Sequence, residues 1–100
     1  MRIRNIDGTS DTACTCGSWL DHWKSFSGCT VPLSCPVDRC GRVDLVGAHV
    51  QKADGMDGRW YIYPLCSAHN WSVGILDVPD YYPFVPANKS ETCGKWRPAF

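Results

Sequence analysis

The sequence predicts a small α+β domain, and three observations lead to this prediction. The chain has 100 residues, the length of a single domain. Two segments rich in β-branched and aromatic residues flank a glycine-containing turn, and a segment of helical periodicity precedes them. Four cysteine and histidine residues stand in two pairs around these strands. We therefore expect one domain over residues 1–100, with a β-hairpin and a short helix as its core (residues 35–70), an extra N-terminal helix and a C-terminal strand.

The N-terminal third predicts an extended arm followed by a helix. Residues 1–13 begin with an alternating segment that ends in a turn. Ser18 suits the N-cap position, because a serine hydroxyl accepts a hydrogen bond from a free N–H of the first helical turn. The aromatic residues after it recur at i, i+4 and i+7, on one helical face: Trp19, Trp23 and Phe26. This pattern predicts a helix over residues 18–26 whose aromatic face packs into the core; the alternative is an aromatic face that binds a ligand.

The middle of the chain predicts an antiparallel hairpin. Residues 43–50 are rich in β-forming residues, and Gly47 within them permits a bend or the close approach of another segment. A turn with two glycines, residues 54–58, leads to a second strand over residues 59–63. We expect Pro64 to end that strand, because proline cannot donate a hydrogen bond to a sheet.

The C-terminal part predicts a short helix, which should begin near residue 65 or 66, and then a strand over residues 73–78. Three prolines interrupt residues 79–86, which favours a loop or an edge strand there.

Charge and composition argue against several classes of protein. Ten basic and ten acidic residues cancel, and the basic residues are scattered singly, whereas nonspecific nucleic-acid binding needs clustered cations. No apolar run reaches transmembrane length, and residues 1–10 lack the pattern of an export signal. We therefore expect a cytoplasmic protein without a membrane partner. In that reducing compartment the seven cysteines more often hold metal than form disulfides, although a secreted, disulfide-stabilised protein is the alternative.

Four residues have the spacing of a structural zinc site: Cys35, Cys40, Cys66 and His69. Zinc takes four soft or borderline ligands at the corners of a tetrahedron. A cysteine pair on a tight turn supplies one edge, and Gly41 should help the backbone amides turn toward the sulfur. A pair at i and i+3 on a helix supplies the opposite edge, so the order of turn pair, hairpin and helical pair is that of a treble-clef zinc finger. The alternative is that the cysteines are small buried apolar residues.

The same residues resemble a known family. The pair of Cys35 and Cys40, the segment Gly47–Val50 and the segment Pro64–Asn70 are similar to the zinc-stabilised HNH, or ββα-metal, endonucleases. The resemblance covers residues 35–70. It implies that His49 matches the general base of the family, which activates water for attack on a phosphate, and that a catalytic metal stabilises the developing charge.

Three positions depart from the pattern of that family. Tyr61 stands where the family usually has an asparagine, His69 replaces the usual zinc-binding cysteine, and Asn70 replaces the catalytic histidine that follows. A histidine that binds the structural zinc is not free for catalysis. We therefore expect an HNH-like or treble-clef scaffold without nuclease chemistry, in which His49 has a functional role or is a buried histidine of the hairpin.

Three of the remaining cysteines could belong to a second metal site. Cys14, Cys16 and Cys93 could bind a second zinc together with one further ligand, drawn from His22, His49 or Cys29. The alternative is that each is a free or buried thiol.

The expected function is that of a small intracellular zinc-binding interaction module, from a bacterium or phage. Aromatic residues would provide anchors for a partner that is either a protein or a nucleic acid with stacked bases: Trp60, Tyr61, Tyr63, Trp71, Tyr81 and Tyr82. The alternative is a divergent HNH-type metal-dependent nuclease that uses His49 as its general base.

Overall fold

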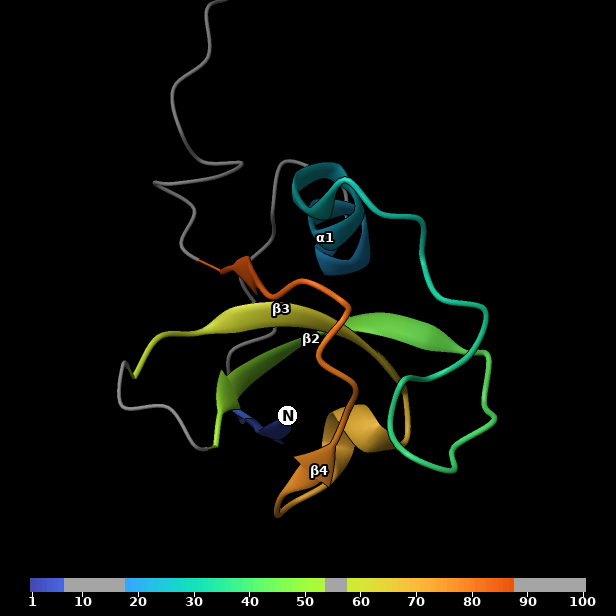
Figure 1. Cartoon of the computed structure of the whole chain (residues 1–100), viewed down its shortest axis with the longest axis vertical. Helices are drawn as coiled ribbons and strands as arrows, with labels where there is room; N and C mark the ends of the chain where they lie inside the picture. Colours follow the sequence, from blue (N-terminus) through green and yellow to red (C-terminus); the bar gives the residue numbers. More distant parts are fainter. Residues whose placement is uncertain (7–17, 54–57, 88–100) are drawn as a thin grey trace, which may run out of the picture.

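The computed structural model describes residues 1–6, 18–53 and 58–87, and it confirms the α+β class (Figure 1). Within these residues one antiparallel sheet has the strand order β4-β1-β2-β3-β5. Its strands are β1 (Arg2–Asn5), β2 (Leu45–Lys52), β3 (Tyr61–Cys66), β4 (Leu76–Asp77) and β5 (Val85–Pro86). The helix α1 (Trp19–Ser27) lies on one side of the β2–β3 ribbon, and β4 lies with a short 3₁₀ helix, η1 (His69–Trp71), on the other side.

The helix α1 begins and ends at the predicted signals. Ser18 is its N-cap, and the Oγ of Ser18 accepts a hydrogen bond of 3.1 Å from the backbone N–H of Asp21. Gly28 ends the helix in the left-handed conformation, with a φ of 73° that glycine adopts at no steric cost. Of the predicted aromatic face, Trp23 is fully buried and its indole N–H donates to the carbonyl of Pro83, whereas Phe26 at the end of the helix is exposed.

Gly47 in β2 is the point at which α1 touches the sheet. A Cβ atom added to Gly47 would lie 2.3 Å from the carbonyl carbon of Trp19, a distance that no packed structure tolerates. The first turn of α1 therefore rests directly on the backbone of β2. The close approach that the sequence predicted at this glycine is confirmed.

The hairpin of β2 and β3 is longer than predicted, because Pro64 does not end β3. Pro64 pairs with Gly47 in the middle of the ladder, and β3 continues to Cys66. The N–H of Ser67 points to β2, where it donates to the carbonyl of Asp44, so alternation places the nitrogens of Cys66 and Pro64 on the opposite side. Proline needs no donor partner there, and the prediction that it breaks the strand was wrong.

The core fills both faces of the sheet. On the α1 side Trp23 packs with Ile62 and Val85. The other side holds a larger cluster: Ile3, Cys35, Val37, Ala48, Val50, Tyr61, Tyr63, Leu65, Cys66, Leu76 and Val78.

The predicted C-terminal strand is reduced to the two residues of β4, which pair with β1. Among the described residues, no helix has the length and apolar character needed to cross a membrane.

Candidate metal centre

Three cysteines and one histidine from separate elements converge beside the end of β3: Cys35, Cys40, Cys66 and His69. Cys35 and Cys40 come from the loop that precedes β2, Cys66 is the last residue of β3, and His69 is the first residue of η1. Their sulfur and nitrogen ligand atoms all lie within 4.8 Å of one another. These four residues lie close enough to hold a metal ion.

Three of the distances between the ligand atoms lie close to those of a tetrahedron around one ion, and all six lie within 4.8 Å. With Zn–S bonds of about 2.3 Å and Zn–N bonds of about 2.0 Å, a tetrahedron has S···S edges of about 3.8 Å and S···N edges of about 3.5 Å. The Cys40 and Cys66 sulfurs lie 3.9 Å apart. The Nδ1 of His69 lies 3.6 Å from the Cys35 sulfur and 3.3 Å from the Cys66 sulfur. The side chains therefore present a set of four ligands compatible with zinc.

Backbone amides point at the sulfurs, as thiolates require. The N–H of Cys66 donates to the sulfur of Cys35 at 3.3 Å, and the N–H of His69 donates to the sulfur of Cys66 at 3.4 Å. Burial raises the pKa of Cys35 to about 11, whereas the backbone N–H of Arg42 lowers the pKa of Cys40. A cation held by the four ligands would supply the positive charge that a buried thiolate at Cys35 otherwise lacks.

The turn between the first two cysteines depends on Arg39 and not on Gly41. The N–H of Cys40 donates to the carbonyl of Val37 at 3.0 Å and closes the turn. Arg39 within this turn has a φ of 66°, and it is the non-glycine residue with a positive φ in the described part of the chain. Gly41 has no positive φ and a Cβ atom there would meet open space. The backbone N–H of Arg42, just after Gly41, does face the Cys40 sulfur as predicted, but no glycine-specific conformation is needed for it.

The second pair of ligands does not sit on one helix, which corrects the prediction of a helix from residue 65 or 66. Cys66 still belongs to β3, a two-residue turn follows, and η1 begins only at His69. The side-chain amide of Asn5 in β1 donates to the carbonyls of His69 and Ser72 and so ties η1 to the sheet. The backbone of the ligand turn is thus fixed from outside the hairpin.

A cluster of polar side chains joins the two halves of the centre. Arg42 donates two hydrogen bonds to the carboxylate of Asp44, at 3.1 and 2.9 Å, and the hydroxyl of Ser67 donates to the same carboxylate. Arg42 and Ser67 hold the pKa of Asp44 well below its usual range. The segment after Cys40 is therefore tied to the turn after Cys66. Sequence reasoning missed this clamp, because nothing in the local spacing pairs Asp44 with Ser67.

His49, the predicted general base, lies apart from the ligand cluster on the α1 side of the sheet. It is 6% exposed, pairs across the hairpin with Ile62, and its ring packs edge-on against Trp19 with centroids 4.6 Å apart. Burial and the nearby His22 lower its pKa. Its surroundings are those of a core histidine, and a catalytic role for it stays a prediction.

The other predicted site residues have mixed outcomes. Cys14, Cys16 and Cys93 lie outside the described residues, so a second zinc site also stays a prediction. Cys29 is not part of the ligand cluster; its thiol donates to the carbonyl of Ser27. Tyr61 and Tyr63 are core residues, so their prediction as anchors for a partner was wrong, whereas three other aromatic residues are exposed: Trp60, Trp71 and Tyr81.

No protein-family model, no curated protein and no solved structure matches this chain. The resemblance to HNH endonucleases and the treble-clef assignment therefore stay predictions, and function has to be argued from the site itself.

Proposed function

We propose that this chain is a zinc-binding domain whose metal is structural, and that it acts as a non-catalytic interaction module on a treble-clef-like, HNH-like scaffold. The observation that carries the proposal is the closed set of four ligands beside β3. Three thiolates and one imidazole are a set that zinc prefers, because zinc binds both soft sulfur and borderline nitrogen ligands in tetrahedral geometry.

The completeness of the ligand set supports a structural role. A catalytic zinc keeps one coordination position for water or substrate, whereas four protein ligands fill the tetrahedron. Cys35 and Cys66 are buried, 3% and 0% exposed, which leaves little room for a substrate at the ion. His69 is bound to the ion in this scheme and is unavailable as a base.

An arginine–carboxylate pair lies beside the centre. Three thiolates and a divalent ion carry a net charge of −1. The guanidinium of Arg42 lies near Cys40 and Cys66, whose thiolates add to the effect of Asp44 in raising the pKa of Arg42. The same guanidinium is bonded to the carboxylate of Asp44, so the Arg42–Asp44 pair as a whole adds no net charge to the centre.

Cobalt substitution and chelation test the proposal together. Wild-type protein reconstituted with Co²⁺ should show the visible bands of tetrahedral cobalt and a thiolate-to-cobalt charge-transfer band, and a strong chelator should unfold the zinc form. Cys66→Ala should abolish both the bands and the fold, whereas Cys29→Ser, outside the cluster, should retain both. A chelated wild-type protein that keeps its near-UV circular dichroism would contradict a structural role.

A further inference from the structure

The three cysteines of the metal centre differ in their exposure to solvent. Cys40 is partly exposed, whereas Cys35 and Cys66 are buried. Cys40 also lies in a loop whose neighbouring residues, 38, 39 and 41–44, are all exposed. Cys40 is therefore the cysteine of the centre that a small solute in water can reach.

A second thiol of the centre lies beside Cys40. The sulfurs of Cys40 and Cys66 are 3.9 Å apart. A disulfide bond is about 2.05 Å long, so these sulfurs would need to approach by about 2 Å to form one. The movement falls on Cys40, because Cys66 is held in the ladder of β2 and β3 opposite Leu45. A shift of the exposed Cys40 loop disturbs little of the buried packing.

The bound metal determines which cysteines are ready to react. Zinc binds its cysteine ligands as thiolates, and the thiolate is the form of cysteine that attacks an oxidant. Cys29 provides a contrast within the chain, because it is also partly exposed but lies outside the ligand cluster. Its S–H donates to the carbonyl of Ser27. Cys40 differs from Cys29 in having a metal site around it and a second thiolate next to it.

We propose that the metal centre is a redox-sensitive switch, in which a hydroperoxide converts Cys40 and Cys66 to a disulfide and so releases the zinc. This inference rests on the proposed function as a structural zinc domain and names how that same site is regulated.

The reaction takes place in two steps. The thiolate of Cys40 attacks one oxygen of H₂O₂, the O–O bond breaks, a sulfenic acid forms at Cys40, and the leaving hydroxide takes up a proton to become water. The thiolate of Cys66 then attacks the sulfenic sulfur and displaces its hydroxide, which takes up a second proton and leaves as water. In total the two thiolates lose two electrons to one H₂O₂, two protons are consumed, and two waters form.

The disulfide removes half of the ligand set. Its sulfurs carry no negative charge, so Cys35 and His69 are the two ligands of the cluster that remain for the ion. Structural zinc needs four ligands, so the ion is released. Since the proposed role of the metal is to stabilise the domain, oxidation turns the module off.

Oxidation of the zinc-loaded full chain by H₂O₂ tests the inference, with a coloured chelator present to report released zinc. Peptide mapping by mass spectrometry, after free thiols have been blocked, should find Cys40 joined to Cys66. This disulfide should accumulate at the same rate as zinc is released. Dithiothreitol followed by Zn²⁺ should restore the near-UV circular dichroism of the starting protein, because thiol–disulfide exchange returns both thiolates.

Two variants are the controls, and their zinc content is measured before oxidation. Cys40→His leaves two cysteines and two histidines, a common ligand set of structural zinc, and should retain the metal. Because its remaining cysteine ligands are buried, peroxide should release its zinc at least about tenfold more slowly than that of wild type. Cys29→Ser should release zinc at the wild-type rate.

A disulfide that joins Cys40 to Cys35 or to any cysteine other than Cys66 would overturn the inference, as would equally fast release from Cys40→His. If Cys40→His holds no zinc, the disulfide map of wild type and its rate decide the question alone. A wild-type protein that binds no zinc refutes the proposed function. A wild-type protein that binds zinc and keeps it in peroxide refutes this inference and leaves the structural zinc site standing.

Discussion

At the scale of single residues, the histidines His22 and His49 are placed where their charged forms are disfavoured. His22 is fully buried, and its Nε2 is 2.9 Å from the carbonyl of Pro86. His49 lies between β2 and α1, and Trp19 makes T-shaped ring contacts with both histidines. Burial lowers the pKa of each, and proximity to His22 lowers that of His49 further. A protonated imidazole is therefore less stable in the folded protein than in the unfolded chain.

This pKa shift predicts that stability falls with acid. Unfolded histidine takes up a proton near pH 6.5 and the folded protein only at lower pH, so the unfolded state binds more protons in between. Stability is complete above about pH 6.5 and is lost as the pH falls toward the folded-state pKa. Urea unfolding between about pH 7.5 and pH 5.5 should therefore show a shallower loss for His49→Gln than for wild type.

Acid also releases the metal, and it does so in wild type and in His49→Gln alike. The effect of His49 is therefore the difference between the two proteins in how the free energy of unfolding depends on pH. Equal pH dependence in wild type and His49→Gln would show that burial of this imidazole does not contribute.

The close contact between Gly47 and α1 leads to a second prediction, about stability. Gly47→Ala would force a Cβ atom to within 2.3 Å of the Trp19 backbone, so α1 must move away from β2. We expect a loss of about 1–3 kcal/mol or more in the free energy of unfolding, measured by denaturant titration of the zinc form. Gly41→Ala is the matched control, because nothing lies within 4 Å of its Cβ position. A Gly47→Ala protein as stable as Gly41→Ala would contradict this packing.

Residues whose roles depend on local spacing were predictable from the sequence. Ser18 was identified as a cap, and each pair of ligands was identified as a pair, because each signal lies within a few positions of its partner. The two pairs, of which Cys40 and Cys66 are 26 positions apart, were joined by the order of turn pair, hairpin and helical pair that is typical of a treble-clef zinc finger. The orientation of Tyr61 and Tyr63 was not predictable, since it depends on which face of β3 meets the larger core cluster. The role of Asp44 was missed because its partner Ser67 lies 23 positions away and no sequence pattern joins the two residues.

At the scale of elements, two loops hold the metal centre, and a side-chain clamp joins them. The loop before β2 supplies Cys35 and Cys40, and the turn after β3 supplies His69. Arg42, Asp44 and Ser67 connect these loops on the solvent side, and Asn5 anchors η1 from β1. The order of these elements could be predicted from the sequence, but the residues at which they begin and end could not. Pro64 fits inside β3 only because its nitrogen faces away from β2, which is a property of the register.

Because the clamp of Arg42, Asp44 and Ser67 connects the two ligand loops, we expect zinc to dissociate more slowly than it would from the four ligands alone. Asp44→Asn removes the charge that accepts from Arg42 and Ser67, so the two loops can separate more easily. Zinc transfer to a coloured chelator should become faster, by about tenfold if Asp44 acts as outer-shell partners of metal ligands usually do. Asp80→Asn, in an exposed loop, is the control and should transfer zinc at the wild-type rate. Identical rates for Asp44→Asn and wild type would show that the clamp is not part of the metal centre.

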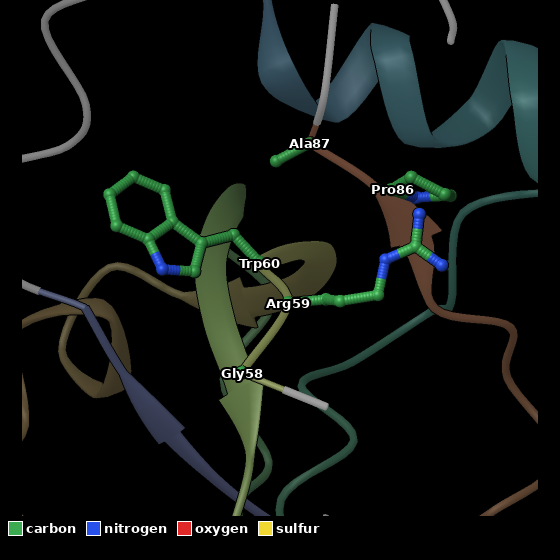
Figure 2. Close-up of a pocket in the computed structure, with 5 residues that line it drawn as sticks. All are labelled: Gly58, Arg59, Trp60, Pro86 and Ala87. Carbon is green, nitrogen blue, oxygen red and sulfur yellow. The ribbon is translucent and has the colours of Figure 1, made fainter. Parts of the chain in front are cut away.

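At the scale of the whole molecule, the β2–β3 hairpin separates two sites. One end carries the ligand cluster, and the other end carries a hollow lined, among the described residues, by Gly58, Arg59, Trp60, Pro86 and Ala87 (Figure 2). A domain of this length buries a modest core, so it gains from a staple, and structural zinc contributes about 10–16 kcal/mol of apparent binding free energy in small zinc domains. The metal would thus stabilise the scaffold from one end of the hairpin.

The most direct test of this account is native mass spectrometry, with an element-specific metal assay, on protein purified without added metal. The account predicts that wild type retains zinc, that Cys66→Ser carries one zinc fewer, and that Cys29→Ser carries the same number as wild type. Folded wild-type protein without metal, or with its thiols paired as disulfides, would contradict the central claim that zinc holds this domain together.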